Sequence, residues 1–500
     1  MKILRQLGAN SAIYTATNML QRGTAFLLMP LYTLYLDPSA YGVLAIVTAV
    51  NGLLSIVFTL GLTSAMTRFY FEYANVPNTL AEFWGSILVF VLLLSGALGG
   101  LLLLVGDVLL RPLIGNVQFW PFVALGVMAT FFQPFFTTFL AVLQMRNQAG
   151  RYAAVSLAHF ALTTFLTVAL VVFLGWGVSG PLIATLVAAA VFFVVSLVLL
   201  RDDLRLTLQW RHLRPALGYS LPLVPHSISG QATAFADRLV LNSYLGTAAA
   251  GLYSVGAMIA LVVEVAAQSV NRAYVPLTMA ALKRGEPEDI QQIRSIGTLV
   301  VALFCLLGSV VASFSGELLH LMAGAAFTGA AQVIPLLVFA AVANAVYFLF
   351  VNVLFYDRSA VKLIPVGTLT AALASVLLSL TLVPRFGLMG AATATLVAQV
   401  VSATVIAVLG RRFDPVRWSY ARYTFAFVAS LGVGIGLAGL DLGSTGATIV
   451  CKFAAVAGLA MLLGIILWNR PLIFGRACIS LILRRPDAAA ALFANSKVIA

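Results

Sequence analysis

The chain has 500 residues, of which 62% are hydrophobic and only 9% are charged, and its mean hydropathy is +1.04. Soluble proteins carry about 25% charged residues, so this composition excludes a soluble domain and predicts a polytopic membrane protein. The net charge of +13 is explained by Lys and Arg in the cytoplasmic loops of such a protein, and we exclude nucleic acid as a partner.

Fourteen apolar runs are long enough to cross a hydrocarbon core of about 30 Å. In chain order they begin near residues 10, 41, 80, 117, 152, 177, 217, 250, 293, 328, 361, 387, 420 and 448. We therefore predict an all-α integral membrane protein with about 14 transmembrane helices. The first apolar run is expected to be retained as a span, because no small-residue cleavage site follows it closely.

The basic residues orient these spans. Of the 29 Lys and Arg residues, 24 fall on the N-terminal side of the predicted membrane and two, Arg22 and Arg238, fall within spans. The opposite side has three, namely Arg111, Arg385 and Lys452. Because cytoplasmic loops are enriched in Lys and Arg, both termini are predicted to be cytoplasmic.

An internal repeat divides the chain. GWGVSGPLIATLVA, from residue 175, matches RFGLMGAATATLVA at an offset of 210, and YLDPSAYGVL, from residue 35, matches YLGTAAAGLY at an offset of 209. The near-constant spacing predicts two parallel six-helix repeats around a central cavity, as in a rocking transporter. The expected divisions are residues 1–210, residues 211–412, two additional helices over 413–470, and a cytoplasmic basic amphipathic tail over 471–500.

The predicted seventh span, within residues 219–254, breaks the rules for an ordinary membrane helix. It carries Pro222, Pro225 and Gly230 near its start, and Asp237 beside Arg238 further on. Proline removes a backbone hydrogen-bond donor, so Pro222, Pro225 and Gly230 are a candidate hinge. Ions within a span face protein or water rather than lipid, so this helix is expected to line one half of the cavity.

Polar residues at helical spacing form stripes on four predicted spans. They are Tyr14, Asn18 and Arg22 in the first span; Asn51, Ser55, Thr59, Thr63 and Thr67 in the second; Ser227, Gln231, Arg238 and Asn242 in the seventh; and Glu264, Gln268 and Arg272 in the eighth. The repeat makes the first two spans equivalent to the seventh and eighth, so the stripes are expected to face one cavity. Single Ser and Thr residues, by contrast, more often bond to their own backbone.

The cations of these stripes are spaced across the membrane. Arg22 is expected near the middle, Arg238 towards the outer face, and Arg68 and Arg272 at the cytoplasmic ends of their helices. The arrangement predicts a path for an anionic group, because a guanidinium binds a phosphate with two hydrogen bonds. A structural interpretation stays open, in which Glu264 pairs with Arg22 and Asp237 with Arg238.

Three segments carry a family resemblance. They are LLMPLYTLYLDPSAYGVLAIVTAV, GLTSAMTRFYFE and ADRLVLNSYLGTAAAGLYSVGAMIA. With them the chain resembles, over nearly its whole length, the polysaccharide-transporter (oligosaccharide flippase) family of the multidrug/oligosaccharidyl-lipid/polysaccharide exporter superfamily. The resemblance implies alternating-access movement of an undecaprenyl-pyrophosphate-linked oligosaccharide across the bacterial inner membrane, for surface polysaccharide (lipopolysaccharide or exopolysaccharide) biosynthesis.

The same resemblance assigns residues and partners. Substrate contacts are expected from Arg22, Arg68, Arg238, Arg272, Asn18, Gln231, Asn242 and Gln268, and coupling or ion pairing from Glu264 and Asp237. The expected partners are the lipid-linked oligosaccharide, membrane lipids and other membrane proteins of polysaccharide biosynthesis. No enzyme activity, cofactor or metal is expected, and the coupling ion, H⁺ or Na⁺, is left open.

Three alternative functions remain open at this stage. A multidrug or small-solute cation antiporter would need acidic cavity residues, and the predicted cavity has more arginines (Arg22, Arg68, Arg238 and Arg272) than carboxylates (Asp237 and Glu264). A lipid II flippase for peptidoglycan synthesis would share the architecture. A membrane-embedded polymerase or ligase would need a large outer loop with catalytic residues, and every predicted outer loop is short. We find no nucleotide-binding loop and no nucleophile elbow.

Overall fold

The structure is a computed structural model that describes residues 13, 14, 16, 17, 26, 28–73, 75–357 and 359–468. Within these residues the regular secondary structure is helical, and eleven helices are long and apolar enough to cross a membrane. The predicted all-α membrane architecture is confirmed. The count of 14 stays a prediction, since the expected first span is largely outside the described residues and one long helical segment holds two expected spans.

The chain packs as two compact units, residues 1–254 and 255–500. The helices of the first unit are α2 (Pro38–Thr59), α3 (Leu62–Tyr73), α4 (Pro77–Leu109), α5 (Arg111–Ile114), α6 (Ala124–Met145), α7 (Ala149–Val168), α8 (Ser179–Leu200), α9 (Trp210–Ser220) and α10 (Val224–Leu245). The first turns of α11 (Thr247–Arg284) also belong to it. The packing boundary therefore lies at Ser254, whereas the repeat places the start of the second half near residue 211, and that repeat-based division stays a prediction.

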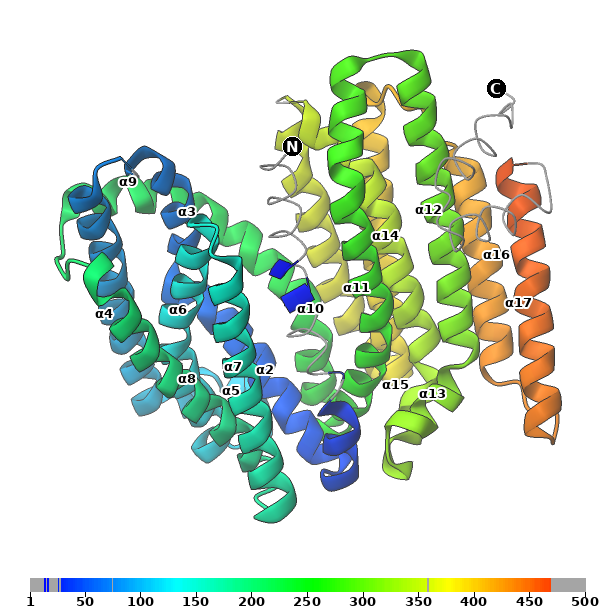
Figure 1. The fold of residues 1–500 in the computed structure, drawn as a ribbon. Helices are drawn as coiled ribbons and strands as arrows, with labels where there is room; N and C mark the ends of the chain where they lie inside the picture. The colour runs from blue at the N-terminus through cyan, green and yellow to red at the C-terminus, as the bar shows by residue number, and fades with distance from the viewer. Residues whose placement is uncertain are drawn as a thin grey trace. The chain divides into compact units, whose positions relative to one another are not determined.

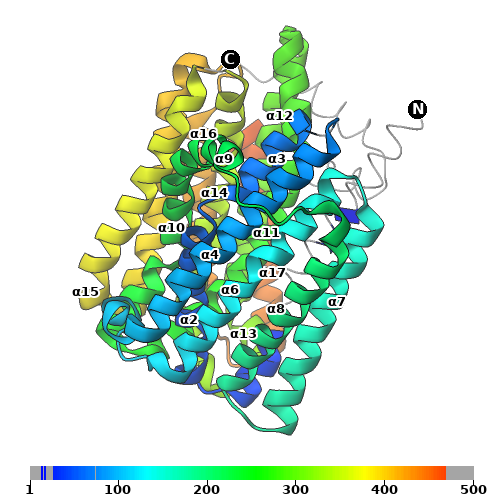
Figure 2. The same ribbon diagram turned by 90° about the vertical axis from the view of Figure 1, so that its left-hand side faces the viewer.

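Helix α6 is central to the packing of the first unit. It lies against α2, α4 and α8, and α7 packs beside α8 (Figures 1 and 2). Two apolar clusters fill the interior, one around Phe83 and Trp84 of α4 and the other around Phe58 and Phe119. Burial of these large aromatic side chains, rather than hydropathy alone, fixes which faces of the helices point inward.

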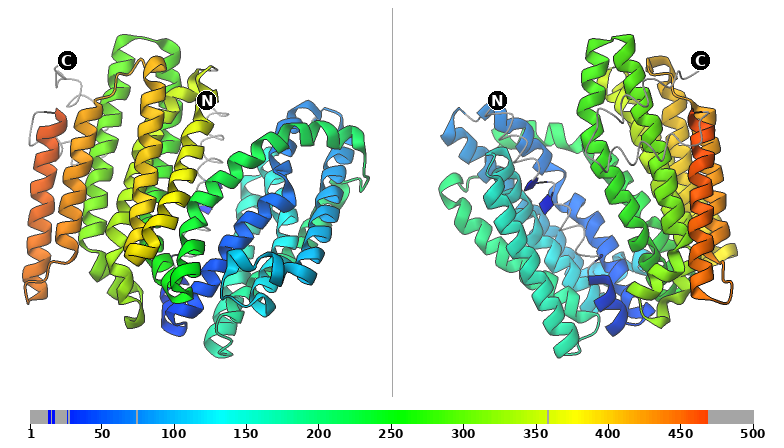
Figure 3. Two further views of the ribbon diagram at one scale, coloured as in Figure 1. Left: turned by 180° about the vertical axis from the view of Figure 1, so that it is seen from behind. Right: turned by 45° about the vertical axis from the view of Figure 1, so that its right-hand side comes forward.

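The second unit is built from the remainder of α11 and from six later helices. These are α12 (Pro287–Ser313), α13 (Ser315–Met322), α14 (Ile334–Tyr356), α15 (Ile364–Gly410), α16 (Tyr420–Ala438) and α17 (Thr445–Trp468). Helix α14 packs against α12 and α15, and α16 packs against α12. The two additional helices predicted beyond residue 412 are α16 and α17, which lie side by side (Figure 3).

Glycines turn the chain at equivalent points of the two repeats. Gly177 and Gly387 have φ values of 51° and 58°, in the region that favours glycine. At Gly387 the long segment α15 reverses, since a Cβ placed on Gly390 would lie 2.3 Å from the carbonyl oxygen of Leu382. The expected eleventh and twelfth spans are therefore the two arms of α15.

A second break interrupts the predicted second span. Leu60 and Gly61 have φ values of 47° and 69°, and they separate α2 from α3. The polar stripe from Asn51 to Thr67 consequently does not run along one continuous helix. A left-handed pair of residues ends the hydrogen-bond ladder of an α-helix, so the stripe changes direction at this point.

Candidate functional site

The predicted hinge coincides with an interruption between two helices. Helix α9 ends at Ser220, a 3₁₀ turn covers Leu221–Leu223, and α10 begins at Val224. Pro222 lies in the 3₁₀ turn and Pro225 in the first turn of α10, where a missing backbone donor is tolerated. A Cβ at Gly230 would meet no atom within 4 Å. The local break is therefore present, and its movement stays a proposal.

The start of α9 is anchored to α4 by charged side chains. Arg211 donates to Glu82 across 2.7 Å, and the His212 imidazole lies 3.8 Å from the same carboxylate. Burial lowers the pKa of His212, the neighbouring Arg211 lowers it further, and Glu82 acts in the opposite direction. This anchor precedes the interruption at Pro222, so bending there leaves the α9 attachment intact.

Asp237 and Arg238 of α10 contact two consecutive residues of α11. The Tyr253 hydroxyl donates to Asp237 across 2.8 Å, and Asp237 is only 2% exposed. Arg238 donates from Nε to the Ser254 hydroxyl across 3.0 Å and lies 5.3 Å from the Phe235 ring centroid. The arginine is therefore positioned by a hydroxyl and an aromatic ring within the first unit.

Gln231 and Asn242, also on α10, make contacts inside the first unit. Gln231 donates to the carbonyl of Gly52 in α2 across 3.4 Å. Asn242 is 1% exposed and donates to the carbonyl of Ile114, at the end of α5, across 2.6 Å. Both amides hold α10 to its neighbours, and their predicted role in substrate binding has no direct support from these contacts.

The predicted Thr stripe bonds to its own backbone. Ser55 donates to the carbonyl of Gly52, Thr59 to that of Ser55, and Thr67 to that of Thr63, at 2.8, 2.7 and 3.2 Å. Such bonds satisfy a hydroxyl in an apolar helix without any ligand. In the same stripe Asn51 is half-buried, and its buried Oδ1 atom has no hydrogen-bond partner among the described residues.

A polar cluster lies in the second unit between α11 and α14. Glu264 accepts from Gln268 across 3.0 Å and from Asn344 across 2.9 and 3.1 Å. Two turns further along α11, Asn271 accepts from Asn352 of α14 across 2.8 Å. Among the described residues, two neutral amides thus satisfy the Glu264 carboxylate, and its predicted pairing with Arg22 stays a prediction because Arg22 lies outside them.

Arg272 follows this cluster on α11 and is exposed. None of the ion pairs found among the described residues includes it. Arg68, in contrast, is paired with Glu72 one turn along α3 at 2.7 Å. Exposed ion pairs between residues four apart contribute little to stability. The Arg68 side chain remains 52% exposed, so it is accessible despite the pairing. Arg22 and Asn18 lie outside the described residues.

Sequence reasoning missed three asparagines and two hydroxyl residues. Asn271, Asn344 and Asn352 belong to the α11–α14 cluster, while Tyr253 and Ser254 hold Asp237 and Arg238. Asparagine is costly in an apolar helix unless it is hydrogen-bonded. Asn344 and Asn352, eight residues apart on one predicted span, could therefore have indicated that this span has polar partners.

Among the described residues, no group of three His, Cys, Asp or Glu side chains could hold a metal ion.

Comparison with solved structures relates this fold to membrane transporters. "Lipid II flippase MurJ, inward closed conformation" matches with a TM-score of 0.69 and 13% identity, over 91% of this chain and 99% of that chain. An inward-facing multidrug resistance MATE family transporter of the MOP superfamily matches with a TM-score of 0.61 and 20% identity, over 78% of this chain and 94% of that chain. At these identities the likeness concerns the fold.

Sequence comparison identifies the family. A Haemophilus influenzae protein named "Lsg locus putative protein 1" is 25% identical over 353 residues, which is 69% of this chain and 84% of that protein. The family model described as "Polysaccharide biosynthesis protein" matches residues 7–283, more than half of the chain. The resemblance predicted from the three sequence segments is confirmed. The chain is a multi-pass membrane protein that belongs to the polysaccharide biosynthesis protein family.

Proposed function

We propose that this protein is a flippase that moves an undecaprenyl-pyrophosphate-linked oligosaccharide across the bacterial inner membrane, for surface polysaccharide biosynthesis. Family membership supports the class of substrate, and the transporter fold supports alternating access. In this proposal both termini are cytoplasmic, the protein has no enzyme activity, and Pro222, Pro225 and Gly230 provide the bend between conformations.

The observation that carries the proposal is the exposed Arg272 at the end of a polar helix face. Helix α11 has 38 residues and is therefore about 57 Å long, well beyond the hydrocarbon core of about 30 Å. If its start lies at the outer boundary, Arg272 lies near the inner headgroup level. A guanidinium without an ion-pair partner at that level suits a pyrophosphate, which carries charge at the same depth.

The neighbouring amides suit the sugar part of the substrate. Gln268 and Asn271 precede Arg272 on α11, and amides can both donate to and accept from sugar hydroxyls. In the first unit Arg238 provides a second cation in a membrane-length helix. We assign Arg22 and Arg68 to the same substrate path from their positions in the sequence.

The acidic residues favour this proposal over a cation antiporter. Glu264 is hydrogen-bonded by two amides and Asp237 by a tyrosine hydroxyl. A cationic drug would have to displace these donors, at a cost of about 1–3 kcal/mol for each polar group left unsatisfied. Glu264 is nevertheless the best candidate for a coupling site, because its neutral partners allow it to bind H⁺ or Na⁺.

Replacing Arg272 by alanine tests the proposal. The Arg272→Ala variant should reduce surface polysaccharide at least about tenfold, because a charge-assisted hydrogen bond contributes about 1.5–3 kcal/mol. The measurement is polysaccharide export in cells that carry the variant as their sole copy, at matched protein level. Arg272→Lys should retain part of the export, since it keeps the charge and loses only the bidentate geometry.

Arg284→Ala is the matched control. Arg284 is an exposed arginine on the same helix, and it is already bonded to Asp289. The control removes the same charge from the same helix and should export normally. Equal export by Arg272→Ala and Arg284→Ala would contradict the proposed substrate role. Uptake of cationic dyes by purified protein in vesicles, unaffected by Arg272→Ala, would favour the antiporter instead.

A further inference from the structure

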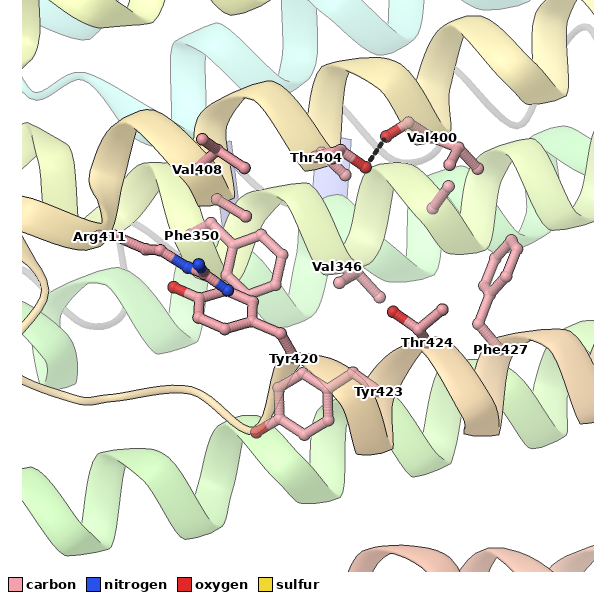
Figure 4. A pocket seen from close by; sticks show the side chains of 13 residues that line it. Val346, Phe350, Val400, Thr404, Val408, Arg411, Tyr420, Tyr423, Thr424 and Phe427 are labelled. Carbon is pink, nitrogen blue, oxygen red and sulfur yellow. Dashed lines mark hydrogen bonds between the residues drawn. The ribbon is translucent and has the colours of Figure 1, made fainter.

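An apolar groove runs between three helices of the second unit. It has a volume of about 230 Å³, and its walls include Val346 and Phe350 of α14, Val400 and Thr404 of α15, and Phe427 of α16 (Figure 4). We call it the α14–α16 groove. It is separate from the α11–α14 polar cluster, because none of Glu264, Gln268 or Asn344 lines it.

The residues around the groove are those of a lipid-facing surface. On α15, Val400 is 37% exposed and Val408 is 56% exposed, and on α16 Phe425 and Val428 are more exposed still. A contiguous apolar surface of this kind in a membrane span is in contact with acyl chains rather than with water. The groove is therefore accessible from the bilayer.

The depth of the groove matches one leaflet. Its lining begins at Val400 on α15, and Arg411 lines it directly after the helix ends at Gly410. Eleven residues of helix correspond to about 16 Å, close to half of a hydrocarbon core of about 30 Å. The distribution of basic residues predicts that the Arg411 end faces the cytoplasm, so the groove lies in the inner leaflet.

A cation lies at the mouth of the groove. The Arg411 guanidinium lies 5.1 Å from the Tyr420 ring centroid (Figure 4). No ion pair found in the described part of the chain includes Arg411. Asp414, the nearest carboxylate in sequence, accepts from the Val416 amide and the Tyr420 hydroxyl. Exposed Arg412, with Arg417 and Arg422 further along, leaves this end of the groove positively charged.

We propose that the α14–α16 groove binds an acyl chain of an anionic phospholipid of the inner leaflet, with the phosphate held by Arg411. The apolar walls contact the acyl chain, and the Arg411 guanidinium, stacked on the Tyr420 ring, binds the phosphate of the headgroup. A groove one leaflet deep fits an acyl chain, whereas a long polyisoprenoid chain is longer than the groove. The site would attach α16 to α14 and α15 through lipid, independently of any transported substrate.

The test is lipid retention by the purified full-length protein, measured by native mass spectrometry. Delipidated protein is titrated with phosphatidylglycerol carrying palmitoyl and oleoyl chains, and separately with phosphatidylcholine of the same chains. We expect phosphatidylglycerol to be retained at least about tenfold more tightly, because only it leaves a net negative charge for Arg411. Arg411→Gln should abolish this preference, whereas Arg412→Gln should change it less than about twofold, since Arg412 does not line the groove.

A second pair of variants tests the groove itself. Thr404→Trp fills it, and Val428→Trp adds the same ring to an exposed position of α16 outside it. Retention should fall for Thr404→Trp and stay unchanged for Val428→Trp. If Thr404→Trp fails to fold, the two arginine variants decide the question, because both arginines are exposed.

Three results would overturn the proposal. Equal losses for Arg411→Gln and Arg412→Gln would show general charge attraction, and equal retention of phosphatidylcholine would show that no headgroup is selected. Preferential retention of a polyprenyl phosphate over phosphatidylglycerol would identify the occupant as an isoprenoid tail. None of these measurements depends on glycan export, so failure here is distinguishable from failure of the proposed function.

Discussion

At the scale of single residues, a buried ion pair holds the last helix. Lys452 is 2% exposed, donates to Glu317 of α13 across 2.6 Å, and lies 5.5 Å from the Phe314 ring centroid. The basic-residue count assigned Lys452 to an outer loop, but the structure places it two turns into α17. A buried ammonium needs a partner, and Glu317 provides it.

Replacing Lys452 by methionine should destabilise the protein. The variant leaves the Glu317 carboxylate without its cation, at a cost of roughly 1–3 kcal/mol, and the melting temperature in detergent should fall by at least about 2 °C. Adding Glu317→Gln should restore much of the loss, because no uncompensated charge then remains. The exposed Lys283 gives the control Lys283→Met, which should melt as the parent does. A Lys452→Met protein with the parental melting temperature would show that the pair contributes nothing.

At the scale of elements, two repeat-related glycines bring α2 and α11 into backbone contact. A Cβ on Gly42 would lie 1.8 Å from the carbonyl oxygen of Thr247, and a Cβ on Gly251 would lie 1.9 Å from that of Pro38. The offset of 209 relates Pro38 to Thr247 as well as Gly42 to Gly251. The contact is therefore symmetric with respect to the repeat, and it lies wholly within the first unit.

Gly42→Ala should separate these helices. The added methyl group cannot fit against backbone atoms, so the melting temperature should fall by several degrees, as in other overpacked contacts that cost about 1–3 kcal/mol. Gly100→Ala is the matched control, because a Cβ at Gly100 on α4 meets no atom within 4 Å. The control should be neutral or slightly stabilising, since alanine favours a helix over glycine. Equal melting of the two variants would contradict close packing at Gly42.

The sequence predicted much of the element order, because its signals were periodic and repeated. Hydropathy located α4, α12 and α14, and the repeat marked Gly177 and Gly387, which share the same left-handed φ. It did not predict the break at Leu60, because leucine in a left-handed conformation leaves no compositional signal. The stripe through Thr59 and Thr63 therefore extended across two helices.

The candidate site was less predictable than the fold. Alignment of polar residues found Glu264 and Gln268, which do contact each other. It gave no information on partners from other helices, so Asn344 and Asn352 were missed. Asn242 donates to the carbonyl of Ile114, a contact that its spacing does not indicate, and its role in substrate binding stays a prediction. Helical periodicity tells which residues share a face, whereas tertiary packing decides what that face touches.

At the scale of the whole molecule, the protein is a member of the polysaccharide biosynthesis protein family with a fold shared by MurJ and MATE transporters. The central proposal is that its substrate is a lipid-linked glycan that crosses the membrane. A lipid II flippase would have the same architecture and the same need for cations. The two functions differ in which lipid-linked sugar is retained on the cytoplasmic side when the protein is removed.

The most direct test is therefore the sidedness of lipid-linked glycans in cells depleted of the protein. Inverted and right-side-out membrane vesicles are probed with an enzyme or lectin that cannot cross the bilayer, and the accessible undecaprenyl-pyrophosphate-linked species are identified by mass spectrometry. We predict that the repeat-unit oligosaccharide of a surface polysaccharide accumulates facing the cytoplasm, while lipid II keeps its normal distribution. Accumulation of lipid II instead, or an unchanged distribution of both, would contradict the proposed function.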